Sequence, residues 1–289
     1  MNDPTQPLSI ILPAKNEAES LTQLLPALRA RFPDAEIIVV NDASTDATPE
    51  VARAHGVRVL TQPYGKGNGA AIKTGARAAN GEILVFMDAD GQHQPNDVSK
   101  LLDKIGKGYD MAVGARTFRS QANMHRAVAN GFYNRLASWM VGHTVADLTS
   151  GFRAVRADRF REFLHLLPNG FSYPTTSTMA FFRAGYSVVY EPVTVLRRTG
   201  KSHISPLADG MRFVMIIFRI GTLYSPLKLF LPISLTFFLT GLSYYLYTHM
   251  TDGRFTNMSA LLLSTSVLVF LIGLVSEQIT ALLYSGANK

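Results

Sequence analysis

Residues 83–93 read Ile-Leu-Val-Phe-Met-Asp-Ala-Asp-Gly-Gln-His, an apolar run that ends in two aspartates. The apolar stretch Ile83–Met87 predicts a buried β-strand. Asp88 and Asp90 follow it, and two carboxylates one residue apart repel each other unless a cation or solvent screens them. A hard divalent cation such as Mg²⁺ or Mn²⁺ takes oxygen ligands of this kind, so the pair is a candidate metal site. A solvated turn is the alternative interpretation.

Apolar runs and helical patterns alternate on both sides of this strand. Strands that alternate with helices predict an α/β domain with a mainly parallel central sheet covered on both faces. Ligands of such sheets bind beyond the carboxyl ends of the strands, where Asp88 is expected. The expected strands are Leu8–Leu12, Glu36–Val40, Val57–Leu60, Ile83–Met87 and Met111–Val113. The expected helices are Glu17–Arg31, Thr45–His55, Gly69–Ala79 and Asn96–Lys107, and beyond them come helices near His125–Val141 and Ala157–Leu166 and a strand at Ser187–Tyr190.

Three further loops carry polar residues at the ends of predicted strands. Asn16 and Glu17 follow the first strand, and Asp42 follows the second. The third predicted strand is followed by Gly65-Lys66-Gly67-Asn68-Gly69, where glycines permit a close backbone approach and the lysine can meet a phosphate. Ordinary helix N-caps are the alternative interpretation of Asn16 and of Ser44 or Asp46. If the loops are functional, they converge on one pocket at the edge of the sheet.

The charge distribution divides the chain after residue 226. The net charge of +7 favours an anionic partner, and the absence of cysteine excludes disulfides and thiolate metal sites. Residues 229–250 and 259–276 carry no Asp, Glu, Lys or Arg, and the apolar pattern of the second stretch continues past Glu277. They predict membrane helices at about 229–250 and 259–284, each long enough to cross an apolar core of about 30 Å. The short polar link between them predicts a hairpin. A pair of buried core helices is the alternative.

We therefore expect three parts: a soluble domain over 1–205, an interfacial amphipathic helix over 206–226 and two transmembrane helices over 227–289. Arg212 and Arg219 are seven residues apart and share one helical face, which suits the headgroup layer of a bilayer. A helix packed against the soluble domain is the alternative. Basic residues gather before the first span, so the positive-inside rule predicts a multi-pass protein of the cytoplasmic membrane with its large domain in the cytoplasm.

Read in order, these motifs resemble the family-two glycosyltransferases with a GT-A type nucleotide-binding fold. Within that family the chain resembles the polyprenyl-phosphate branch, which is dolichol-phosphate mannose synthase-like. The chain departs from the pattern at Asn41, where an acidic residue is more usual. The resemblance implies nucleotide contacts from Pro13, Asn16, Glu17, Asp42, Lys66 and Gly67, and metal ligation by Asp88, Asp90 and Gln92.

Motifs for an acceptor follow later in the chain. Gly114-Ala115-Arg116 resembles a motif whose arginine meets the acceptor phosphate, with Arg126 as a candidate companion. The segment from Asp147 to Arg153 is similar to the acceptor-side segment of the family. Arg197-x-x-Gly200-x-Ser202 resembles a signature near the membrane, although His203 stands where lysine is usual. A solvated basic face is the alternative for each arginine.

The implied reaction fits these residue types. A lipid monophosphate has a second pKa of about 6, so it already carries a nucleophilic oxyanion and needs no general base. The enzyme must hold two anionic groups together, which calls for a metal on the donor side and arginines on the acceptor side. The resemblance thus implies metal-dependent, inverting transfer of one hexose from a GDP-mannose or UDP-glucose type donor to a polyprenyl phosphate at the cytoplasmic membrane face. The residues expected to carry catalysis are Asp90, Arg116 and Arg197.

Other functions are kept as alternatives. A catalytically silent subunit that binds nucleotide-sugar or lipid phosphate within a membrane assembly would carry the same loops. A processive polysaccharide synthase is disfavoured, because Trp139 lacks the Gln-x-x-Arg-Trp setting and two spans are too few for a polymer channel. Nucleic acid is not an expected partner, since the basic residues lack interleaved aromatic platforms. A homo-oligomer stays open.

Overall fold

The computed structural model describes residues 7–116, 124–170, 172–195, 218, 221–222 and 224–285, without the side chains of 124–130 and 285. The chain divides into two compact units, Met1–Phe213 and Val214–Lys289. The expected interfacial helix over 206–226 lies mostly outside the described residues. Its limits and those of the soluble domain stay predictions.

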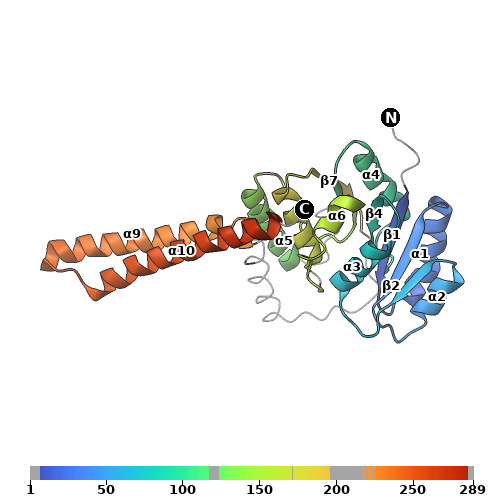
Figure 1. Cartoon of the computed structure of the whole chain (residues 1–289), viewed down its shortest axis with the longest axis horizontal. Coiled ribbons are helices and arrows are strands. Elements are labelled where there is room, and N and C mark those ends of the chain that lie inside the picture. The colour runs from blue at the N-terminus through green and yellow to red at the C-terminus, as the bar shows by residue number, and fades with distance from the viewer. Residues whose placement is uncertain are drawn as a thin grey trace. The chain divides into compact units, whose positions relative to one another are not determined.

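The first unit is built on a seven-stranded sheet in the order β3-β2-β1-β4-β6-β5-β7 (Figure 1). Every strand pair is parallel except the two that involve β6, which runs antiparallel to β4 and to β5. The predicted α/β fold with a mainly parallel sheet is confirmed. The strands are β1 (Leu8–Ala14), β2 (Glu36–Asn41), β3 (Arg58–Thr61), β4 (Ile83–Phe86), β5 (Met111–Arg116), β6 (Arg153–Arg156) and β7 (Val188–Val193).

Helices cover both faces of this sheet. One face packs against α1 (Ala18–Arg31) and α4 (Pro95–Gly106), which share one buried apolar cluster with the strands. The other face packs against α3 (Asn68–Ala78), where Gly75 lies against the side chain of Ile11. The remaining helices of the unit are α2 (Thr48–Ala54), α5 (Met124–Val141), α6 (Ala157–Glu162) and α7 (Tyr173–Arg183).

Two elements differ from the sequence prediction. No strand was predicted at β6 and no helix at α7. β6 pairs with both β4 and β5, and the ring of Tyr173 in α7 lies 6.5 Å from the ring of Phe86 in β4, so both missed elements complete the core. The predicted helix over 157–166 is also shorter, since α6 ends at Glu162.

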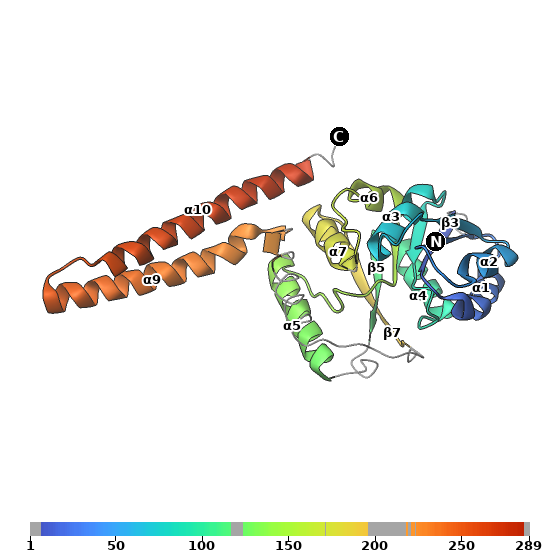
Figure 2. The same ribbon diagram turned by 90° about the horizontal axis from the view of Figure 1, so that it is seen from below.

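The second unit contains a helical hairpin of α9 (Pro226–Asp252) and α10 (Asn257–Ser285), which run side by side (Figures 1 and 2). Gly253 ends α9 in the left-handed conformation, with φ of 62°. Ser234 Oγ donates a hydrogen bond of 2.9 Å to the carbonyl of Ser266 between the helices. Both helices are long and apolar enough to cross a membrane. Only 11% of the 18-residue apolar stretch of α9 and 17% of that of α10 is buried. This exposure contradicts the alternative of buried core helices within the unit.

Candidate active site

The two aspartates lie at the carboxyl end of β4. Met87 and Ala89 are each 1% exposed, which fixes the turn in the core and leaves Asp88 and Asp90 half-buried at the edge of the sheet. Gln92 N donates to Asp90 Oδ1 at 3.1 Å, which closes the turn. The predicted carboxylate pair therefore stands where ligands of such sheets bind.

Asp88 is packed against a glycine from a distant segment. A Cβ on Gly151 would lie 3.6 Å from Asp88 Oδ2 and 3.1 Å from Tyr173 Oη. The Tyr173 hydroxyl donates to the Gly151 carbonyl at 3.0 Å. Burial raises the pKa of Tyr173, so its phenol stays a neutral donor. Gly151 thus provides the room in which the carboxylate of Asp88 sits.

The donor atoms at this edge fit a hard divalent cation. Asp88 and Asp90 are partly accessible, and with the Gln92 amide they offer only oxygen or amide ligands. No cluster of three or more His, Asp or Glu side chains able to hold a metal occurs in the part of the chain that the structure describes. Two carboxylates leave coordination positions for phosphate oxygens, as Mg²⁺ sites with nucleotide substrates usually do.

The loops after β1 and β2 are fastened to each other. Asn16, with φ of 57°, donates its backbone N–H to Ser44 Oγ at 2.9 Å, and its Oδ1 accepts from Thr45 N at 2.8 Å. Asp46 Oδ2 accepts from the N–H of Ala18, the first residue of α1. The amide of Asn16 therefore joins two loops. Asp46 therefore accepts a hydrogen bond from the first turn of α1 and another from Thr48 N, two residues further on.

Asp42 organises the glycine-lysine-glycine loop. It is 6% exposed, and its two carboxylate oxygens accept from Lys66 N at 2.6 Å and Gly67 N at 3.0 Å. The Lys66 side chain is exposed, with Nζ 5.2 Å from the centre of the Tyr64 ring. The carboxylate expected to contact the base holds this loop in place.

Glycine is required where this loop meets residues 168–170. A Cβ on Gly69 would lie 2.1 Å from the carbonyl oxygen of Pro168, and one on Gly67 would lie 2.7 Å from that of Asn169. Ala70 N donates to the Asn169 carbonyl at 3.0 Å. The start of α3 is therefore pressed against a segment about a hundred residues later, and no side chain fits between them.

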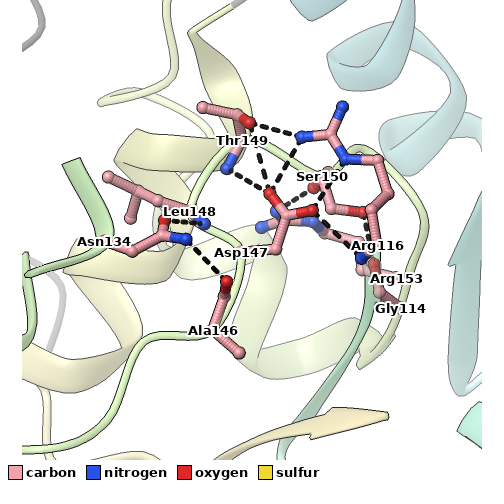
Figure 3. Close-up of polar contacts among 9 residues, drawn as sticks. All are labelled: Gly114, Arg116, Asn134, Ala146, Asp147, Leu148, Thr149, Ser150 and Arg153. Atoms are coloured by element: carbon pink, nitrogen blue, oxygen red, sulfur yellow. Dashed lines mark hydrogen bonds and ion pairs between the residues drawn. The ribbon is translucent and has the colours of Figure 1, made fainter. Parts of the chain in front are cut away.

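Arg116, at the carboxyl end of β5, is held by Asp147 (Figure 3). Its Nε donates to Asp147 Oδ2 at 2.7 Å, and its Nη2 donates to Asp147 Oδ1 at 2.9 Å and to Thr149 Oγ1 at 2.6 Å. The carboxylate side chain is 4% exposed and the guanidinium side chain 30%. The edge of the guanidinium expected to grip a phosphate thus already binds a carboxylate. No hydrogen bond among the described residues uses Nη1.

Burial and charge oppose each other in this pair. Burial acts to lower the pKa of Arg116, but the hydrogen bond and charge of Asp147, with a smaller effect from Asp88, raise it. Burial acts to raise the pKa of Asp147, but Arg116 and the N–H of Thr149 hold it below its usual value. Both groups therefore stay charged at neutral pH.

The segment that carries Asp147 is tied to helix α5. Asn134 donates through Nδ2 to the Ala146 carbonyl at 2.6 Å and accepts from Leu148 N at 3.0 Å (Figure 3). Ser138 Oγ accepts from Val145 N at 2.9 Å. These bonds fix residues 145–148 on either side of the carboxylate.

Two further buried residues were quoted within motifs but given no role from the sequence. His93 is 7% exposed and stacks on Phe152 with ring centres 4.5 Å apart; burial lowers its pKa, which keeps it neutral. Arg153 is fully buried and donates to the Pro174 carbonyl at 3.1 Å and to Ser177 Oγ at 2.7 Å. Because no strand was predicted at residues 153–156, the sequence offered no signal that Arg153 is buried and bonded to α7.

The structure brings some of the predicted residues together. Because β4 and β5 both run antiparallel to β6, Asp88 and Arg116 lie at the same edge of the sheet. Pro13 is half-buried within β1, and Glu17 accepts from Ser20 Oγ at 3.2 Å. Arg126 lies in α5, and its side chain is outside the described residues, as are Arg197, Ser202 and His203.

Comparison with known proteins agrees with this geometry. Residues 9–164 match Glycosyl transferase family 2, and residues 225–282 match the GtrB C-terminal hairpin. A dolichyl-phosphate hexose transferase of Haloferax volcanii is 31% identical over 206 residues, covering 70% of this chain and 89% of the relative. A polyprenol monophosphomannose synthase of Mycolicibacterium smegmatis is 32% identical over 215 residues, covering 68% and 79%.

Solved structures support the fold. Glucosyl-3-phosphoglycerate synthase from Mycobacterium tuberculosis, in complex with phosphoglyceric acid, matches with a TM-score of 0.60 at 20% identity, covering 74% of this chain and 80% of that one. The same enzyme with Mn²⁺, UDP and glucosyl-3-phosphoglycerate matches with a TM-score of 0.56 at 21% identity, covering 74% and 78%. The chain therefore belongs to glycosyl transferase family 2 and is a glycosyltransferase, as its motifs predicted.

Proposed function

We propose that this enzyme transfers a single hexose from a nucleotide-sugar to a polyprenyl phosphate, with inversion at the anomeric carbon and with a divalent metal. The curated relatives support the acceptor class, since their names include dolichyl-phosphate, undecaprenyl-phosphate and polyprenol transferases. The hairpin supports a lipid acceptor, because a chain anchored in a bilayer keeps an insoluble substrate within reach.

One observation carries the proposal: a single short segment, residues 147–151, touches both halves of the site. At one end Asp147 holds Arg116, and at the other Gly151 lies against Asp88. The Asp88 carboxylate, proposed for the donor side, and the Arg116 guanidinium, proposed for the acceptor side, thus both contact this one segment. Such placement is what transfer between two anionic groups requires.

The chemistry follows from the charges present. The acceptor phosphate supplies its own oxyanion, so the chain must bind and orient it rather than deprotonate it. Arg116 would present Nη1, because its Nε and Nη2 bind Asp147. The fixed charge lowers the cost of bringing the two anions together, and Arg126 and Arg197 would add to it.

On the donor side, Asp88, Asp90 and Gln92 would hold Mg²⁺ or Mn²⁺. Such an ion neutralises the diphosphate as it leaves. Lys66 and Gly67 lie in the loop proposed to border the nucleotide, and Pro13, Asn16, Glu17 and Asp42 shape that side. Ser202 would act near the membrane on the acceptor side.

We place the enzyme in the cytoplasmic membrane with two spans and its catalytic unit in the cytoplasm. The basic residues that precede the first span support this orientation. Nucleotide-sugars are cytoplasmic, so donor and catalytic unit would share a compartment. The donor is either GDP-mannose or UDP-glucose in type.

A panel assay tests the function. Purified full-length protein is incubated with polyprenyl phosphate in vesicles and with each of several radiolabelled nucleotide-sugars, and lipid-linked product is extracted. One hexose per lipid from one donor is expected. Binding of a nucleotide-sugar without turnover would instead identify a silent binding subunit, and products longer than one sugar would identify a processive synthase.

A further inference from the structure

Arg153 is a buried cation within the sheet, and the reaction proposed above gives it no role. It is the first residue of β6, where it pairs with Phe86 of β4 on one side and with Val113 of β5 on the other. β4 leads to Asp88, and β5 ends at Arg116. Arg153 therefore lies between the two strands that carry the proposed donor side and the proposed acceptor side of the site.

Every hydrogen-bond acceptor that Arg153 uses in the described part of the chain is uncharged. Its Nη1 donates to the Pro174 carbonyl at 3.1 Å, to Ser177 Oγ at 2.7 Å and to Thr178 Oγ1 at 3.2 Å. Its Nη2 donates to the Ser150 carbonyl, and its Nε has no partner among the described residues. Carbonyl and hydroxyl oxygens satisfy hydrogen bonds but do not neutralise the positive charge.

A charge of this kind in the core lowers the stability of a protein, because burial removes its solvent. Burial lowers the pKa of Arg153, but a guanidinium stays protonated at neutral pH. Apolar side chains of similar volume often replace buried charges without loss of stability. A buried charge that lowers stability therefore points to a contribution to function.

Arg153 completes the set of charges around residues 147–151. Asp147 lies in this segment, and Asp88 lies against it. The side chain of Arg116 is 30% exposed, whereas Arg153 is fully buried, so Arg153 approaches the segment from the core (Figure 3). Two carboxylates thus face two guanidinium groups, one at the edge of the site and one inside the domain.

Tyr173 connects Arg153 to the neighbourhood of Asp88. Its ring centre lies 5.8 Å from Cζ of Arg153, and its hydroxyl donates to the Gly151 carbonyl at 3.0 Å. A Cβ on Gly151 would lie 3.6 Å from Asp88 Oδ2. The guanidinium is therefore tied to the segment directly at Ser150 and, through the Tyr173 ring, at the next residue.

We propose that Arg153 is a positioning residue whose buried charge offsets the carboxylates of Asp88 and Asp147. It thereby holds residues 147–151 in the position from which donor and acceptor are aligned for transfer. The inference rests on the proposed function. Because Arg153 is fully buried, it acts without touching either substrate.

Kinetics of Arg153→Met test the role in alignment. With the donor that the panel assay identifies, kcat should fall by about a hundredfold, as for a misplacement of about 1 Å, and the KM for the nucleotide-sugar should change by less than about twofold. Arg161→Met is the matched control and should keep wild-type kinetics. The Arg161 guanidinium also donates to backbone carbonyls, those of Ala76 and Ala79, but at the end of α3 away from the site. Thermal unfolding identifies a temperature at which all variants are folded.

Arg153→Lys keeps a cation, fills the position where Arg153→Met fails to fold, and isolates the effect of charge. Burial lowers the pKa of a lysine ammonium, so turnover relative to wild type should be highest near about pH 6.5 and should fall by about tenfold toward pH 9. The titratable groups that face this position are Tyr173, Tyr190 and Asp147. Burial raises the pKa of both phenols; it acts in the same direction on Asp147, but Arg116 holds that pKa low, so none of the three titrates in this range.

Binding of Mn²⁺ alone gives a readout that does not depend on turnover. Loss of a cation near Asp88 should lower the Kd for Mn²⁺ by about three- to tenfold in Arg153→Met, whereas loosening of residues 147–151 without a charge effect would raise it. Electron paramagnetic resonance of free Mn²⁺ measures this Kd, and Arg161→Met should keep the wild-type value.

Three results would each overturn the inference: a wild-type kcat in Arg153→Met, turnover of Arg153→Lys that does not fall with pH relative to wild type, or a Kd for Mn²⁺ that does not decrease in Arg153→Met. Wild-type protein without turnover would contradict the proposed function instead. The Mn²⁺ measurement would then still decide the role of Arg153.

Discussion

Replacing Asp147 with asparagine removes the charge that holds Arg116 and keeps the shape. The carboxylate accepts five hydrogen bonds: three from the backbone N–H, Nε and Nη2 of Arg116, and two from the N–H and hydroxyl of Thr149. An amide has one oxygen, so in either orientation at least two donors face an NH₂ group. Each hydrogen bond to a charged group contributes about 1.5 to 3 kcal/mol. Arg116 is partly exposed, so water replaces some of the lost bonds, and the free energy of unfolding should fall by about 2 to 4 kcal/mol.

Urea unfolding followed by Trp139 fluorescence measures this loss, because Trp139 lies on the helix that anchors residues 145–148. Asp103→Asn is the matched control. Its carboxylate is 43% exposed and pairs with Lys107 on the surface, a kind of pair that contributes about 0 to 1 kcal/mol. In kinetics, Asp147→Asn should raise the KM for the lipid acceptor and leave the KM for the nucleotide-sugar unchanged. Equal stability of the two variants, or equal rises in both KM values, would refute the clamp.

The same pair predicts a pH dependence. Burial opposes the charge of Asp147, but Arg116 holds its folded pKa below the unfolded value of about 3.9. The stabilisation is therefore fully present above about pH 4 and is lost as pH falls through the folded pKa. The stability gap between wild type and Asp147→Asn should close in acid and stay constant from pH 5 to pH 8. A gap that does not narrow as the pH falls below the unfolded pKa of Asp147 would contradict this assignment.

Two glycine substitutions test the packing, and one glutamate substitution tests a helix cap. Gly69→Ala places a methyl group against the carbonyl oxygen of Pro168 and should destabilise the protein by about 1 to 3 kcal/mol. Gly131→Ala is the control in α5, where no atom lies within 4 Å of the new methyl group, and it should stabilise the protein by about 0.5 to 1 kcal/mol. Thermal unfolding measures both effects, and equal effects would contradict the close approach of Gly69 to Pro168. Glu277→Ala removes the carboxylate that accepts a hydrogen bond from Leu227 N–H at the start of α9. Hydrogen exchange of the amides in the first turn of α9 should become faster, by an amount equivalent to a loss of about 1 kcal/mol in local stability. Exchange rates equal to those of wild type would show that this bond does not stabilise the start of α9.

Much of the fold could be predicted because its first half has a regular pattern. Each strand from β1 to β5 is an apolar run, and the helices between them carry periodic apolar positions, so both types of element were visible. The second half contains elements without such patterns. β6 has two arginines in four residues, and α7 begins with Tyr-Pro-Thr-Thr-Ser-Thr, which is poor in helix formers and fully buried. Tertiary packing decides both.

The site divides in the same way. Asp88 and Asp90 were identified because they end a run of buried residues. The partner of Arg116 could not be deduced, since Asp147 is 31 positions away and reaches Arg116 because β6, which follows it, pairs antiparallel with β5. In the loops after β1 and β2 the sequence identified the polar residues but not their hydrogen-bond partners. Their polar residues were noted, but much of their hydrogen bonding joins the loops to each other.

The role of Asp90 tests the central claim most directly. The initial rate of lipid-linked hexose formation is measured for wild type, Asp90→Asn and the surface control Asp103→Asn, with Mg²⁺ or Mn²⁺ supplied and with the donor that the panel identifies. Loss of a metal ligand should lower the rate of Asp90→Asn by about a hundredfold or more, while Asp103→Asn keeps the wild-type rate. Turnover by Asp90→Asn equal to that of wild type would contradict metal-assisted transfer at this edge of the sheet.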